Sequence, residues 1–114
     1  MTLDDFLKFI DEQDTLFRSL KTSESERERI LARTVKISEE FGELSDEVLA
    51  SVGDQRKGKM AGRSDESLGA EFADVMITTF LLAKSLDIDI MSALDSKVQK
   101  IRQKHNRELT SEKF

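Results

Sequence analysis

The chain has 114 residues, a formal net charge of −5, and neither cysteine nor proline. This length fits one domain, and the absence of cysteine excludes disulfides and thiolate-bound zinc or iron–sulfur sites. The acidic balance argues against a nucleic-acid partner, since such binders are usually basic. No apolar stretch is long enough to span a bilayer, and Met1–Phe6 begins with acids rather than with the pattern of a signal peptide. We therefore expect a cytoplasmic protein with no nucleic-acid or membrane partner.

Apolar residues recur at helical spacing almost throughout the chain. With no proline and only 5 glycines, long uninterrupted helices are possible. Thr2 can cap a first helix over about 3–20, with Asp5 at the capping-box position. Thr22–Ser25 offers a break and a new cap before a long second helix over about 24–51. The apolar stripe predicted for this second helix is Ile30, Thr34, Ile37, Phe41, Leu44 and Val48.

The second half of the chain predicts a loop and two further helices. Residues 53–65 contain glycines and four basic side chains, which are typical of a loop. A third helix is predicted over about 65–86 and, after a short turn, a fourth over about 90–109. The residues expected to face inward from these two helices include Leu68, Phe72, Val75, Leu82, Leu94, Val98 and Ile101. The pattern predicts an all-α four-helix bundle formed by a single domain over 1–114.

Two acidic pairs carry the functional signal. Glu40 and Glu43 lie one turn apart in the second helix, and Glu71 and Asp74 repeat this i, i+3 spacing in the third. At about 100° per residue, both pairs border the apolar stripe of their helix. Two packed helices would then bring four carboxylates together, where like charges raise one another's pKa and destabilise the fold. Mg²⁺ would relieve this repulsion, because it prefers carboxylate oxygens and accepts substrate phosphates as further ligands.

The alternative is that these acids only solvate the helices. Glutamate is a common helix former, and E-x-x-E arises by chance in an acidic protein. For either pair alone, a solvated face is the better interpretation. Two pairs with the same spacing, both beside an inward stripe, leave the metal site and the solvated surface as open alternatives.

Two motifs are K-I-S-E-E-F-G-E-L at Lys36–Leu44 and E-F-A-D-V at Glu71–Val75. Together they resemble the signature of the MazG-like all-α nucleoside triphosphate pyrophosphatases, which is E-E-x-x-E, an intervening segment and E-x-x-D. Downstream, Leu81–Ile90 looks like the family's turn after the third helix, and Lys97–Lys104 looks like its basic final helix. The resemblance covers about residues 30–104.

The resemblance implies an enzyme that hydrolyses a nucleoside or deoxynucleoside triphosphate to the monophosphate and pyrophosphate, removing unwanted nucleotides from the pool. It implies Mg²⁺ as the cofactor, with Mn²⁺ as a substitute, and a homodimer or homotetramer whose site lies near subunit contacts. By position, the metal ligands would be Glu40, Glu43, Glu71 and Asp74. Glu39 would be a further ligand or would orient the attacking water. Lys36 would favour the ionised acids or meet a phosphate. The residues implied for the phosphate chain are Lys97 and Lys100, joined by Arg102 or Lys104.

Other functions were weighed against this one. A phosphoribosyl-ATP pyrophosphatase would use the same chemistry, and a helical interaction protein would use none. A di-iron bundle needs two E-x-x-H motifs, which a chain with the single histidine His105 cannot supply. Phe17 is a candidate for stacking on a nucleobase, although aromatic residues at helical spacing are more often part of a core. The basic residues of the 53–65 loop would close over the phosphates or only keep the loop soluble.

Overall fold

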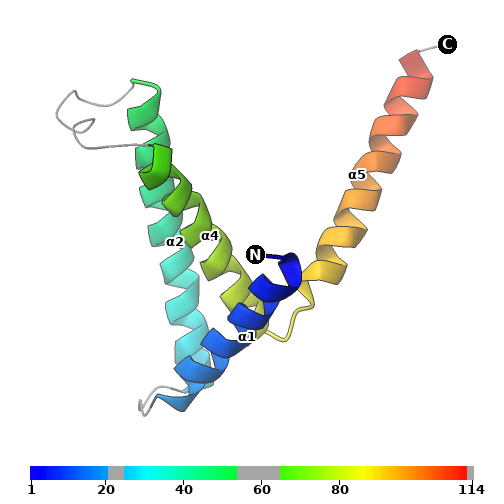
Figure 1. Cartoon of the computed structure of the whole chain (residues 1–114). Helices are drawn as coiled ribbons and strands as arrows, with labels where there is room; N and C mark the ends of the chain where they lie inside the picture. The colour runs from blue at the N-terminus through cyan, green and yellow to red at the C-terminus, as the bar shows by residue number, and fades with distance from the viewer. Residues whose placement is uncertain (21–24, 54–64, 113–114) are drawn as a thin grey trace.

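The computed structural model describes residues 1–20, 25–53 and 65–112. These residues form four helices and no strand (Figure 1), namely α1 (Leu3–Ser19), α2 (Glu26–Ser51), α4 (Asp65–Ser85) and α5 (Ile90–Glu112). The predicted all-α class is confirmed, and each predicted helix end lies within three residues of the observed one. The four basic residues predicted in the loop (Arg56, Lys57, Lys59 and Arg63) lie outside the described residues. None of the described helices is both long and apolar enough to cross a membrane.

Side-chain caps fix the starts of α1 and α2. Thr2 Oγ1 accepts a hydrogen bond from the Asp5 amide at 3.1 Å, and Asp5 Oδ2 accepts one from the Thr2 amide at 2.9 Å. This is the predicted capping box. Ser25 Oγ accepts from the Glu28 amide at 3.2 Å and caps α2. Both helices therefore begin where a side chain satisfies their free amides.

Helix α4 is the centre of the packing. It lies alongside α2 over much of its length, and α1 crosses its C-terminal half (Figure 1). The core at this crossing is small and consists of Ile10, Phe80 and Leu81. The rings of Phe6 and Phe80 meet edge to face, with centroids 5.0 Å apart and planes at 67°. The α2–α4 pair leaves this crossing as one arm of a V (Figure 1).

Helix α5 forms the other arm of the V (Figure 1). Only its first turn, with Ile90 and Met91, packs against the core, and every side chain described from 92 to 109 is exposed. The radius of gyration is 18.6 Å, whereas a compact domain of this length has about 13 Å. Within one chain, the prediction that the α5 stripe faces inward is therefore wrong, and the exposed fractions are 43% for Leu94, 40% for Val98 and 57% for Ile101.

Two phenylalanines also depart from the predicted stripes. Phe41 on α2 is 61% exposed and Phe72 on α4 is 53% exposed. Thr34 and Val48 of the predicted α2 stripe are exposed as well. Three helices pack together in the single chain, and large apolar surfaces are left without a partner.

Candidate metal centre

Three carboxylates meet where α2 and α4 lie side by side. Glu40 and Glu43 project from α2 and Glu71 from α4, and each offers an oxygen that lies within 4.8 Å of the other two. Glu40 is buried, Glu71 is half-buried and Glu43 is exposed. The i, i+3 spacing therefore brings three of the four expected acids to one place. We call this group the acidic centre.

The fourth expected acid, Asp74, lies next to these three. It is exposed on α4, one turn after Glu71. Burial raises the pKa of Glu71 above its ordinary value, and the negative charges of Glu43, Asp74, Glu40 and Glu47 raise it further. Negative charge is therefore concentrated around Glu71 in the described part of the chain.

Two oxygens of the acidic centre lack a hydrogen-bond donor. Glu40 Oε2 and Glu71 Oε2 are buried and accept no hydrogen bond from any described residue. A buried polar atom without a partner costs about 1–3 kcal/mol, and a charged one costs more. Carboxylate oxygens are the ligands preferred by hard divalent cations such as Mg²⁺. The residues present therefore fit a divalent cation, which Glu40, Glu43 and Glu71 would hold.

Lys36 is the one cation that pairs with these acids in the described part of the chain. Its Nζ lies 3.2 Å from Glu40 Oε1 and 3.3 Å from Glu39 Oε2. Hydrogen bonds to Glu40 and Glu39 raise the pKa of Lys36, so the ammonium stays charged. The Glu39 side chain is 58% exposed and stands beside the acidic centre rather than within it. One lysine cannot balance the whole group.

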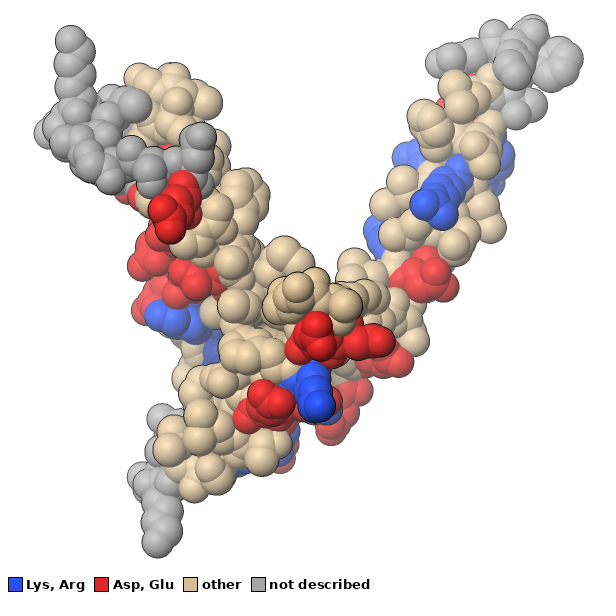
Figure 2. Space-filling view, in the orientation of Figure 1, with Lys and Arg blue, Asp and Glu red and all other residues tan. Residues whose placement is uncertain are grey.

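The basic residues expected from the last helix are not near the acidic centre of their own chain. Lys97, Lys100 and Arg102 are exposed on α5, which diverges from the α2–α4 arm. Figure 2 shows basic side chains along the α5 arm and a gathering of acidic ones on the opposite arm. A single copy of the chain therefore does not bring these three residues to the carboxylates.

Phe17 lies on a pocket near the acidic centre. The pocket has a volume of about 430 Å³ and is formed by the end of α1, the first half of α2 and the middle of α4. Lys36 lines it as well as pairing with Glu40, so the pocket and the acidic centre adjoin. The Phe17 ring is 37% exposed, and the Arg33 guanidinium lies over it at 5.6 Å from the ring centroid.

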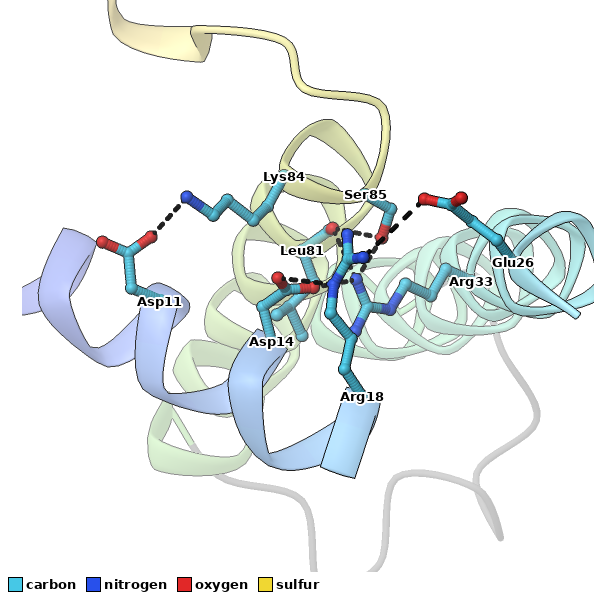
Figure 3. Close-up of polar contacts among 8 residues, drawn as sticks. All are labelled: Asp11, Asp14, Arg18, Glu26, Arg33, Leu81, Lys84 and Ser85. Carbon is cyan, nitrogen blue, oxygen red and sulfur yellow. Dashed lines mark hydrogen bonds and ion pairs between the residues drawn. The ribbon is translucent and has the colours of Figure 1, made fainter. Parts of the chain in front are cut away.

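A second buried charge cluster links α1, α2 and α4 (Figure 3). Arg33 Nη1 from α2 donates to Asp14 Oδ1 on α1 at 2.9 Å, to the Leu81 carbonyl at 3.0 Å and to Ser85 Oγ on α4. Arg18 Nε donates to the other oxygen of Asp14 at 3.0 Å. The Asp14 and Arg33 side chains are 8% and 15% exposed. Burial would raise the pKa of Asp14, but the hydrogen bonds from Arg33 and Arg18 outweigh it and hold the pKa below its ordinary value.

Three charged residues of these clusters were not predicted from the sequence. Glu47 lies one turn beyond Glu43 and adds to the negative charge felt by Glu71, and its i, i+4 spacing from Glu43 was a usable signal. Asp14 and Arg33 gave no such signal, because they are 19 positions apart and meet only after α1 has crossed α4.

Comparison with known proteins bears on the whole arrangement. Neither curated proteins nor solved structures give a significant match to the chain. The model of the MazG-like family matches residues 18–113, which include α2, α4, α5 and every residue of the acidic centre. This match spans nearly the whole chain and supports a pyrophosphatase-type hydrolase in general. The chain therefore belongs to the MazG-like family.

Proposed function

We propose that the protein is a Mg²⁺-dependent pyrophosphohydrolase of nucleoside or deoxynucleoside triphosphates that clears non-standard or surplus nucleotides. The reaction joins a water oxygen to phosphorus and breaks the anhydride bond between the α and β phosphates, which releases a monophosphate and pyrophosphate. The observation that carries the proposal is the convergence of three carboxylates with two buried, unpartnered oxygens. Membership of the MazG-like family supports the same class of reaction.

Four acids of α2 and α4 are proposed to hold the metal. Glu40, Glu43 and Glu71 supply the converging oxygens, and Asp74 lies close enough to raise the pKa of Glu71. When bound, Mg²⁺, or Mn²⁺ in its place, neutralises phosphate charge and provides an activated water. Glu39 is proposed to orient this water and accept its proton, since its carboxylate is exposed beside Glu40.

Cations are needed because the substrate brings a highly charged phosphate chain to an acidic surface. Lys36 is already in place, 3.2 Å from Glu40 Oε1. Lys97, Lys100 and Arg102 are proposed to reach the phosphates from a second copy of the chain, because their own helix leads away from the acidic centre (Figure 1). The functional unit is accordingly a homodimer or a homotetramer.

The exposed apolar stripe of α5 supports this assembly, since such stripes are normally covered in the working molecule. We expect Ile101→Glu to dissociate the oligomer, because a charge would enter the buried interface. Ser96→Glu adds the same charge on another face of α5 and serves as the matched control. Light scattering after gel filtration measures both masses. A monomeric wild-type protein would contradict the proposed assembly.

The reaction itself is tested by resolving products from a panel of triphosphates incubated with the protein and Mg²⁺. Monophosphate plus pyrophosphate is the expected pair. Diphosphate plus orthophosphate would mean that the other anhydride bond is cut, and no turnover of any triphosphate would reject the proposed activity.

A further inference from the structure

The pocket beside the acidic centre has two chemically different ends. Its near end carries Lys36, which is shared with the acidic centre, and Thr78, which lies one turn after Asp74 on α4. Its far end carries Arg29, seven residues before Lys36 on α2 and so about 10 Å further along the helix axis. A ligand whose phosphates bind at the acidic centre through the proposed metal ion would therefore extend its remaining part into this pocket.

The walls between the two ends are mostly apolar. Side chains from all three helices contribute, namely Phe17, Leu20, Ala32 and Leu81. The Phe17 ring is held by the Arg33 guanidinium at 5.6 Å from its centroid, and Arg33 is itself fixed by Asp14 and the Leu81 carbonyl. The pocket thus offers a fixed aromatic ring to a flat, weakly polar group. A nucleobase has this shape and chemistry.

The described hydrogen-bonding side chains of the far end are all donors. The charged side chains that line the pocket are Arg29, Arg33 and Lys36, and its described lining includes no carboxylate or side-chain amide. Arginine and lysine donate hydrogen bonds and accept none. The lining side chain with a lone pair to offer is Thr78, whose hydroxyl belongs to the near end and donates to the Asp74 carbonyl at 2.9 Å. The edge of a base bound in the far end therefore faces the hydrogen-bond donors of Arg29.

We propose that this pocket binds the nucleoside part of the substrate, with the base against Phe17 and its edge toward Arg29, and that it prefers bases presenting a keto oxygen over those presenting an amino group. The proposal rests on the proposed function and adds the substrate class. A keto oxygen accepts a hydrogen bond from Arg29. An amino group would lose its water and find no acceptor among the described side chains of the far end, which disfavours its binding.

Two matched pairs of triphosphates exchange the keto group for an amino group. The neighbouring ring nitrogen changes with it, from an N–H in the keto base to a lone pair in the amino base. Inosine and adenosine triphosphates differ by keto against amino at position 6 of the purine, and uridine and cytidine triphosphates differ in the same way at position 4 of the pyrimidine. With the full-length protein and Mg²⁺, we expect kcat/KM to favour the keto member of each pair by about 10-fold, the lower end of the range for an unpaired polar group because the pocket is open to solvent. Equal values, or a preference for the amino member, would overturn the proposal.

Variants of Arg29 identify the residue responsible. Arg29→Gln introduces an amide that both donates and accepts, so the keto preference should fall toward one. Arg29→Lys keeps a donor without an acceptor and should keep the preference. Loss of the preference in both variants, or in neither, would remove Arg29 from the role.

Phe17 provides a readout that does not depend on turnover. The chain contains no Trp and no Tyr, so Phe17→Trp gives a single emission signal in the pocket wall. Inosine monophosphate should quench this signal at a lower concentration than adenosine monophosphate. If no triphosphate is hydrolysed but this difference is found, the proposed function fails and the pocket assignment stands. If neither monophosphate quenches, or if Phe17→Ala changes the oligomer mass instead of KM, the pocket is not a nucleoside site.

Discussion

Two charge clusters include side chains of α2, one where α1 crosses α4 and one where α2 and α4 lie side by side, and they are built in opposite ways. At the α1 crossing, Asp14 accepts hydrogen bonds from Arg33 and Arg18, and each of its two oxygens has a donor (Figure 3). In the acidic centre, Glu40 and Glu71 each keep a buried oxygen that accepts no hydrogen bond from a described residue. The first cluster is satisfied by side chains of the protein, whereas the second fits the cation that we propose for it. Charges of the first kind hold helices together, and charges of the second kind mark the proposed ligand site.

The largest effect is expected when Arg33, the main partner of Asp14 at the α1 crossing, is removed. Arg33→Ala leaves Asp14 buried with only Arg18 as a partner, and we expect it to lower the free energy of unfolding by about 3 kcal/mol, near the low end for a broken buried pair. Arg18→Ala removes the partner whose side chain is 41% exposed and should cost less than about 1 kcal/mol. Urea denaturation measures both values. Equal losses of unfolding free energy in the two variants would mean that Arg33 is not the main partner of Asp14.

The acidic centre should respond in function rather than in stability. Glu43 is exposed and offers one of the three converging oxygens, so Glu43→Gln should lower kcat by at least about 100-fold while the helical content stays unchanged. Glu12→Gln makes the same change at an exposed position on α1 and should leave kcat unaltered. Steady-state kinetics and circular dichroism provide the two readouts. Full activity in Glu43→Gln would exclude this residue from the metal site.

Titration with Mg²⁺ distinguishes the two clusters by protein stability, with no need to measure turnover. Mg²⁺ at ten times its Kd should raise the free energy of unfolding by about 1.4 kcal/mol, since it binds the folded state. The same titration should stabilise Arg18→Ala to the same extent and Glu43→Gln much less. Denaturation with and without Mg²⁺ measures the difference. An unchanged response in Glu43→Gln would place the bound ion elsewhere.

The smallest expected effects are opposite pH dependences in the metal-free protein. The pKa of Glu71 is raised above 4.5, so the folded state holds its proton more tightly, and stability falls as the pH rises from 4.5 through the raised value. The pKa of Asp14 is lowered below 3.8, so its contribution is present above 3.8 and is lost as the pH falls through the lowered value. Glu71→Gln should flatten the first slope and Asp14→Asn the second. Stability curves measured in a chelator from acid to neutral pH test both signs.

Predictions made from local spacing agreed with the structure most closely. The capping box of Thr2 and Asp5 depends on residues three positions apart and is found, and Ser25 provides the new cap expected within Thr22–Ser25. The pairing of Glu40 with Glu43 also follows from one helical turn, and Glu71 joins them because α2 and α4 lie side by side. Whether these acids bind Mg²⁺ remains a prediction that the titration above addresses.

Predictions that depend on how whole helices are arranged agreed less closely with the structure. The helical spacing of apolar residues in α5 predicts a face that points inward, but Leu94 and Ile101 are exposed in the single chain. Periodicity identifies the apolar side of a helix and does not say whether that side packs against its own chain or another copy. The same limit applies to Lys97 and Lys100, which lie on this arm.

The helices, their caps and the acidic pairs follow from the local sequence, because each depends on side chains within about one turn of helix. Three features come from the folded chain: Arg33 meets Asp14, α5 leaves the other helices, and a pocket adjoins the acidic centre. These features depend on residues far apart in the chain, whose contacts are set by how helices cross. Among the described residues, the charges at the α1 crossing are paired, whereas the acids where α2 and α4 lie side by side outnumber the cations beside them.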